Sequence, residues 1–177
     1  MTIHTVCKYG ECLSPEVLDG VVKNNCHLMV ISSCSDNDKK DRKNICRNWR
    51  TAMAYCNEDV FIGMDSDIVL AENNVLELVK NITDNNIDFA WIAVNPGNSH
   101  GIWAVSKKII DKVPFEIIEN DCPICNWRIK INELGYNTMR VCDVQVKHIN
   151  RLTIKGGHYG RTETERKRNT ADETGGI

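Results

Sequence analysis

An apolar run interrupted by two aspartates constrains this chain more than any other stretch. It reads Val-Phe-Ile-Gly-Met-Asp-Ser-Asp-Ile-Val-Leu and covers residues 60–70. A run rich in Val, Ile and Phe predicts a buried strand. Asp65 and Asp67 are one residue apart, so we expect them on the same side of the chain at the end of that strand. Two ionised carboxylates would repel each other there unless a hard divalent cation, which prefers oxygen ligands, is held between them.

A second interpretation of this stretch needs no metal. Asp-Ser-Asp is also typical of a turn at the end of a strand, in which Asp67 caps a following helix. These residues alone do not separate the two interpretations, so the elements around them have to decide.

Three strand–helix pairs in the first half predict a parallel sheet with right-handed crossovers. The strands are predicted at 3–7, 27–32 and 60–70, and the helices that follow them at about 15–24, 40–55 and 73–82. Ligands of such sheets bind beyond the carboxyl ends of the strands. Asp65, Asp67 and the polar loop 33–38 lie at ends of this kind.

The spacing of apolar residues predicts the buried face of each helix. The second half adds strands at 89–94, 101–106 and 138–149, with a helix at 123–134 that stops at Gly135. The predicted core positions of the helices are, in chain order, Leu18, Val21 and Val22; Ile45, Trp49, Ala52, Met53 and Cys56; Val75, Leu76, Val79 and Ile82; and Ile124, Trp127, Ile131 and Leu134.

Composition indicates one globular domain and excludes some classes of protein. The 177 residues are 42% hydrophobic and 26% charged, and the net charge of −2 gives no basic field for nucleic acid. No apolar run approaches the roughly 20 residues of a membrane helix, and the N-terminus lacks a signal-peptide pattern. We therefore expect a soluble, cytoplasmic protein with a domain over 1–150 and a polar, Gly-containing lid or tail over 151–177.

The nine cysteines have two interpretations. Several lie in apolar segments (Cys26, Cys46, Cys56 and Cys142), where a reduced thiol behaves as a small hydrophobic group. Cys122-Pro123-Ile124-Cys125 is a C-x-x-C motif. Zinc is the weaker interpretation there, because the most plausible partner pair, Cys7 and Cys12, lies at the other end of the chain.

The order of these elements resembles the glycosyltransferase-A fold, in particular the family-2-like nucleotide-sugar glycosyltransferases. The resemblance covers about residues 3–150. It is carried by Arg47-Asn48, the Asp-x-Asp strand 60–70, the glycine-led strand 101–107, the helix start at Asn120-Asp121 and the strand ending at His148. It implies an α/β fold with a mixed, mainly parallel central sheet flanked by helices and a Rossmann-like nucleotide-binding half.

The resemblance also implies a metal-dependent glycosyltransferase that uses a nucleoside-diphosphate sugar. Asp65, Asp67 and His148 would hold Mn²⁺ or Mg²⁺, which bridges the two phosphates as a Lewis acid. Asp65 would also reach the ribose or the sugar, and Arg47 and Asp36 would contact the donor nucleotide. The alternative for His148 is a half-buried histidine on a strand that binds no metal.

Asp121 is the candidate general base. It would take the proton of the acceptor hydroxyl while the leaving group departs from the opposite face, so that transfer inverts the anomeric carbon. An Asp just before Pro123 is also a good helix cap. Trp103 is either a platform for an acceptor sugar or a core residue. The acceptor (glycan, lipid or protein) and self-association stay open, and no nucleic-acid partner is expected.

Two positions depart from the family pattern. Ser32-Ser33-Cys34 stands where an acidic residue usually holds the nucleobase, and Asn120 replaces a Glu. Two other functions therefore stay open. One is a haloacid-dehalogenase-like phosphatase with Asp65 as nucleophile, although no Asp-Asp pair follows downstream. The other is a nucleotide-sugar-binding module without turnover.

Overall fold

A seven-stranded mixed sheet forms the centre of the protein. The computed structural model describes residues 1–8, 10–33, 38–94, 100–117 and 122–149. Five strands run in one direction and β6 and β4 run against them, which confirms the mixed, mainly parallel sheet. In spatial order the strands are β2 (His27–Ser32), β1 (Thr2–Cys7), β3 (Val60–Asp65), β6 (His100–Ser106), β5 (Phe89–Val94), β7 (Thr138–His148) and β4 (Ile68–Val69).

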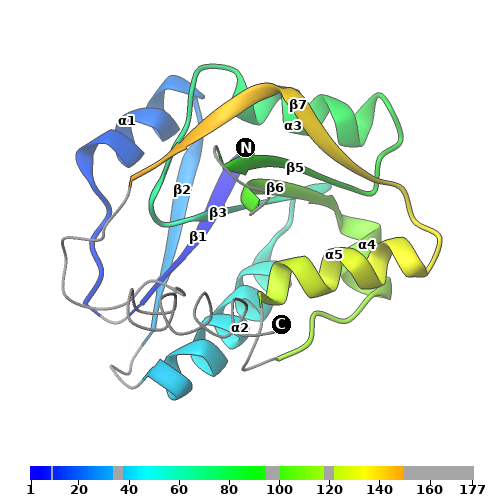
Figure 1. Cartoon of the computed structure of the whole chain (residues 1–177), viewed down its shortest axis with the longest axis horizontal. Helices are drawn as coiled ribbons and strands as arrows, with labels where there is room; N and C mark the ends of the chain where they lie inside the picture. Colours follow the sequence, from blue (N-terminus) through cyan, green and yellow to red (C-terminus); the bar gives the residue numbers. More distant parts are fainter. Residues whose placement is uncertain (9, 34–37, 95–99, 118–121, 150–177) are drawn as a thin grey trace, which may run out of the picture.

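Helices cover both faces of this sheet (Figure 1). On one face α1 (Pro15–Lys23) and α3 (Asn74–Thr83) pack over one hydrophobic core. On the other face α2 (Asp38–Tyr55), α4 (Lys107–Lys112) and α5 (Pro123–Glu133) pack over a second core. The result is a three-layer α/β/α arrangement, as the strand–helix alternation predicts.

Strand β3 lies between β1 and β6 and is buried on both faces because helices cover both sides of the sheet. Its side chains alternate, so Ile62 and Met64 belong to the core under α1 and α3. Phe61 belongs to the core under α2, α4 and α5. All three are fully buried, which is why this stretch reads as a continuous apolar run.

Trp103 is a core residue, and its interpretation as a platform for an acceptor sugar is wrong. The side chain is fully buried and stacks on Phe89 with ring centroids 5.7 Å apart. It also lies directly over Gly63, where an added Cβ would be 2.2 Å from Trp103 Cζ2. The glycine in β3 therefore leaves the space that the indole fills.

The predicted face of α2 is confirmed, since all five predicted core residues are buried, four of them in the helix and Cys56 directly after it. The predicted face of α1 is confirmed at Val21 and wrong at Leu18 and Val22, which are exposed, while Val17 is buried in their place. The cause is Gly20, which lies so close to the chain after β4 that a Cβ would be 2.8 Å from Leu70 N. This contact rotates α1 toward the Val17 side.

Two further helix predictions need a smaller correction. In α3, Leu78 takes the core place expected for Leu76, which is exposed. In α5, Leu134 is 57% exposed because the helix ends before it and Leu134 is the C-terminal cap. Gly135 then adopts φ +83°, as a helix-stopping glycine does.

None of the eight cysteines in the described residues is in a disulfide. Cys46 and Cys56 are buried as predicted, but Cys142 is exposed. The reason is a shift in β7, which pairs with β5 up to Val141 and again from Val146, so that the residues between leave the ladder. None of the helices within the described ranges is long and apolar enough to cross a membrane. The predicted lid or tail over 151–177 lies outside the described residues.

Candidate active site

The two aspartates stand at the carboxyl end of β3 in different environments. Asp65 is the last residue of the strand and is exposed, whereas Asp67 is only 1% exposed. Ser66 and Asp67 form a turn, so the strand ends between the two aspartates. The helix-cap interpretation of Asp67 is also wrong, because the next helix begins only at Asn74.

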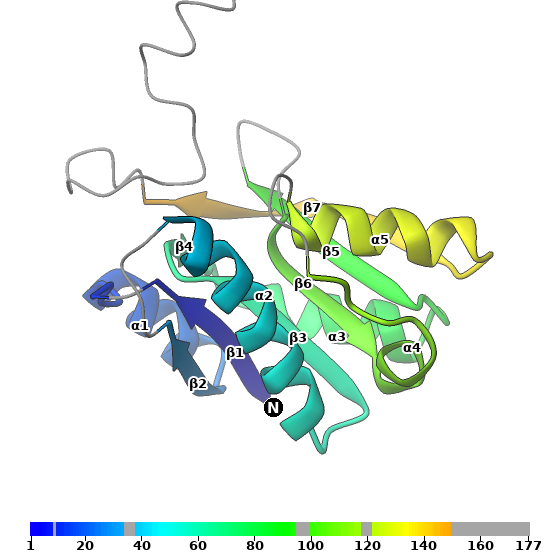
Figure 2. The same ribbon diagram turned by 90° about the horizontal axis from the view of Figure 1, so that it is seen from below.

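Strand β4 brings Asp67 to His148. This two-residue strand pairs antiparallel with β7, with Ile68 opposite His148, and Figure 2 shows β7 crossing to the β4 side of the sheet. The backbone N–H of Ile149 donates to the Asp67 carbonyl oxygen at 2.9 Å. In the side chains, His148 Nε2 lies 2.9 Å from Asp67 Oδ2. Two residues that are far apart in the sequence thus form one carboxylate–imidazole pair.

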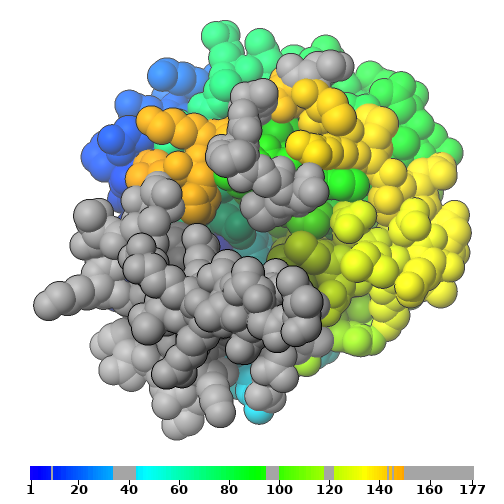
Figure 3. Space-filling view, in the orientation of Figure 1, coloured from blue at the N-terminus to red at the C-terminus, as the bar shows by residue number. Residues whose placement is uncertain are grey.

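This pair fits a divalent cation in separation and in chemistry. An octahedral ion with ligand distances of about 2.0–2.1 Å places adjacent ligand atoms about 2.9 Å apart. That is the separation between His148 Nε2 and Asp67 Oδ2. Carboxylate oxygen and imidazole nitrogen suit Mn²⁺. His148 is 29% exposed, and Figure 3 shows the end of β7 at the surface beside α1, whereas Asp67 is buried, so the histidine is the solvent-facing member of the pair.

Asn24 fixes the chain that follows the pair, a role that the sequence did not reveal. Its Nδ2 donates to the carbonyl oxygens of Gly20 and Ala71, each at 2.9 Å. Its Oδ1 accepts from Val75 N at 3.1 Å. The sequence predicts only that the first helix ends at about residue 24. The side chain in fact ties the end of α1 to the start of α3, and no local pattern signals such a contact.

The other predicted donor contacts are less constrained by the structure. Arg47 lies on α2, is exposed, and donates to Asn44 Oδ1 at 3.3 Å. Asp36 and Asp121 lie outside the described residues. The helix-cap interpretation of Asp121 is wrong, because Cys122 is the N-cap of α5 and its Sγ accepts from Cys125 N at 3.4 Å.

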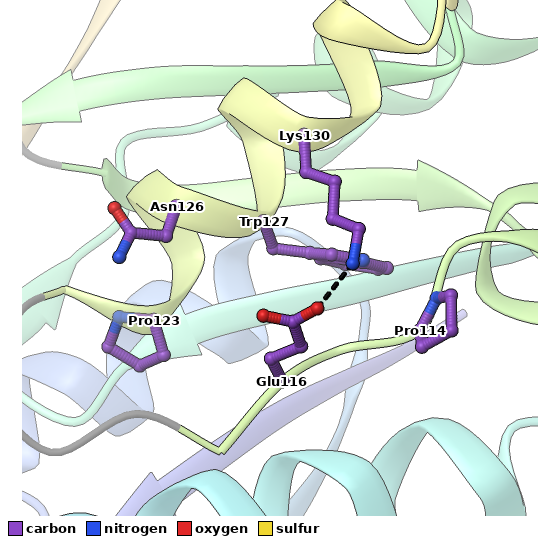
Figure 4. Close-up of a pocket in the computed structure, with 6 residues that line it drawn as sticks. All are labelled: Pro114, Glu116, Pro123, Asn126, Trp127 and Lys130. Atoms are coloured by element: carbon purple, nitrogen blue, oxygen red, sulfur yellow. Dashed lines mark hydrogen bonds and ion pairs between the residues drawn. The ribbon is translucent and has the colours of Figure 1, made fainter.

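A small hollow beside α5 is separate from the predicted site residues (Figure 4). Across its wall Lys130 forms an ion pair with Glu116 near the Trp127 ring. The Trp127 indole N–H donates to Val113 O at 2.9 Å. This hollow is too shallow to enclose a nucleotide. Its lining residues are Pro114, Glu116, Pro123, Asn126, Trp127 and Lys130.

Solved structures match this architecture. A mannosyltransferase from Pyrobaculum calidifontis, in complex with GDP-Man and Mn²⁺, superposes with a TM-score of 0.65 and 14% identity over 83% of this chain and 56% of its own. Glucosyl-3-phosphoglycerate synthase from Mycobacterium tuberculosis, in complex with Mn²⁺ and UDP-Glc, superposes with a TM-score of 0.60 and 16% identity over 85% of this chain and 72% of its own. This chain has a glycosyltransferase-A fold. The A197 protein from STIV superposes with a TM-score of 0.55 and 14% identity over 84% of this chain and 86% of its own.

These identities establish the fold and leave the activity to be argued from the site. The chain spans just over half the length of the mannosyltransferase that it matches. No protein-family model matches the sequence. No curated protein matches it either.

Proposed function

We propose that this chain is a metal-dependent glycosyltransferase that moves a sugar from a nucleoside-diphosphate sugar to an acceptor hydroxyl. The observation that carries the proposal is the Asp67–His148 pair, with 2.9 Å between Oδ2 and Nε2, at the carboxyl end of a central strand. Ligands of open α/β sheets bind at such ends. The fold neighbours that were solved with Mn²⁺ and a nucleotide sugar support the same donor class.

Asp65, Asp67 and His148 would hold Mn²⁺ or Mg²⁺. When bound, the ion supplies Lewis-acid neutralisation of the donor diphosphate. Asp67 is the firmer ligand of the two aspartates, because its carboxylate is buried and its carbonyl is fixed by Ile149 N. Asp65 is exposed at the strand end, and we propose that its carboxylate contacts the ion, the ribose or the donor sugar.

Asp121 is proposed as the general base that takes the acceptor proton, which makes the transfer inverting. In the sequence it directly precedes Cys122, the N-cap of α5. Arg47 and Asp36 are proposed to contact the donor nucleotide. Residues 151–177 would serve as a lid or tail over the site.

Carboxamide variants of the full chain test this proposal. With Mn²⁺ and UDP-Glc or GDP-Man as donor, release of the nucleoside diphosphate reports both transfer and donor hydrolysis. Asp67→Asn should abolish the Mn²⁺-dependent release. Asp121→Asn should lower transfer by about 10²- to 10⁴-fold, the usual contribution of a general base, and should leave donor binding intact. Asp19→Asn, an exposed change on α1, is the control.

Each variant has a result that counts against its assigned role. Unchanged release of the nucleoside diphosphate by Asp67→Asn would show that Asp67 is not a ligand of the required metal ion. Unchanged transfer and hydrolysis by Asp121→Asn would show that Asp121 is no base. Donor binding without any turnover in the wild type would favour a nucleotide-sugar-binding module.

A further inference from the structure

The C-x-x-C motif meets a buried histidine at the start of α5. Cys122 is the N-cap of the helix and Cys125 lies in its first turn. His100 is the first residue of β6 and is 4% exposed. Its Nδ1 lies 3.4 Å from Cys125 Sγ. The ligand atoms of all three residues lie within 4.8 Å of one another.

We propose that His100, Cys122 and Cys125 bind a Zn²⁺ ion that joins the start of α5 to the sheet. The three residues share nothing with the Asp65, Asp67 and His148 site, so this inference does not depend on the proposed transferase activity. It also corrects the sequence interpretation, since Cys7 and Cys12 do not belong to the cluster that the structure forms.

The observed distances suit zinc. A tetrahedral Zn²⁺ with Zn–S of about 2.3 Å and Zn–N of about 2.0–2.1 Å sets neighbouring sulfur and nitrogen ligands about 3.6 Å apart. The Cys125 Sγ to His100 Nδ1 distance of 3.4 Å is already close to that value. Two thiolates and one imidazole are typical zinc ligands, and the fourth position is then open to water or another donor.

The surroundings give the cluster a rigid wall and an open side. The ring centroids of Trp91 and His100 are 5.2 Å apart, and those of Phe89 and His100 are 6.0 Å apart. The Arg128 guanidinium, one turn after Cys125, lies 4.8 Å from the Trp91 centroid. The two ring contacts fix His100 against β5, and the Arg128 contact joins α5 to β5. Cys122 is exposed, so an ion can enter from solvent.

Binding would exchange protons for the ion. The hydrogen bond with Cys125, followed by loss of solvation, raises the pKa of the Cys122 thiol to about 12, although the His100 contact opposes this. The Cys122 thiol therefore carries a proton before binding, and a coordinated thiol loses its proton. Both thiol protons leave to solvent and no oxidant or reductant is involved.

Zinc competition on the reduced full-length chain tests the site. A chromophoric chelator should report one ion per chain, and Co²⁺ in its place should give the visible absorption of tetrahedral sulfur ligation and quench Trp91 fluorescence. Cys122→Ser should lower zinc affinity by more than about 100-fold, because loss of an outer-shell partner alone costs 10–100-fold. Ser is a preferred helix cap, so this variant keeps the start of α5.

Two further variants keep the proposal falsifiable. Cys125→Ser should lose zinc to the same degree, whereas Cys142→Ser, at an exposed cysteine outside the cluster, should bind as the wild type does. Wild-type zinc affinity in both Cys122→Ser and Cys125→Ser would overturn the proposal. So would a wild-type chain whose two thiols form a disulfide in air at the same rate with and without excess zinc.

Discussion

Gly63→Ala should destabilise the protein because a central strand has no room for one more carbon atom. An added Cβ would lie 2.2 Å from Trp103 Cζ2 and 2.3 Å from Cε2. Non-bonded carbons prefer separations of about 3.5–4.0 Å, so either the strand or the indole must move by more than 1 Å. Phe61, Phe89 and Trp49 surround the indole with ring centroids 5.3–5.7 Å away, and they block that movement.

The expected cost follows from overpacking a tight core. Such changes cost about 1–3 kcal/mol in the free energy of unfolding. For a domain of this size, each kcal/mol lowers the melting temperature by about 2–4 °C. We therefore expect Gly63→Ala to melt about 2–12 °C below the wild type, measured by circular dichroism and by urea titration.

A double-mutant cycle isolates the cause. Trp103→Leu removes the ring atoms that the new methyl group meets, so Gly63→Ala should cost at least about 1 kcal/mol less in that background. Gly135→Ala is the matched control. Its Cβ meets nothing within 4 Å, but its φ of +83° is strained for alanine, so its cost should not depend on residue 103. Equal costs of Gly63→Ala in both backgrounds would refute the steric argument.

Two further predictions concern groups that hold the fold. Burial lowers the pKa of His4, and the hydrogen bond to Ile62 O opposes this shift. Because the unfolded chain then binds the proton more readily than the folded chain, the free energy of unfolding should fall as the pH drops below about 6.5. In His4→Gln, the curve of unfolding free energy against pH should be flatter in this range, whereas His27→Gln, an exposed control, should keep the wild-type fall. A wild-type curve without this fall would contradict the role given to His4. Asn24→Ala removes three side-chain hydrogen bonds and should cost about 2–4 kcal/mol in urea unfolding; a loss no larger than that of exposed Asn57→Ala would show that the side chain does not tie α1 to α3.

Regular spacing made α2 and β3 predictable. Five apolar residues at helical intervals define one face of α2, and the apolar run of β3 reports a strand covered on both sides. In α1 the same reasoning failed because Gly20, with no side chain, sets how closely the helix approaches Leu70. Burial by close backbone approach leaves no apolar signal in the sequence.

The candidate site was predictable only in part. Local pattern identified the carboxylates at the end of β3, and the family resemblance supplied His148. The contact itself depends on β4, a strand of two residues that pairs with β7. No periodicity can be read from two residues. The same limit hid His100, since its approach to Cys125 comes from packing of α5 against β6 across 25 residues of sequence.

Metal-dependent nucleotide binding tests the central claim most directly. The melting temperature of the full chain should be measured with UDP and GDP, each with and without Mn²⁺. A bound ligand at 100 times its Kd adds about 2.7 kcal/mol, which corresponds to about 5–11 °C here. We predict a shift of this size with at least one nucleotide, only when Mn²⁺ is present, and its loss in Asp67→Asn. If neither diphosphate stabilises the protein in a Mn²⁺-dependent way, the account is contradicted.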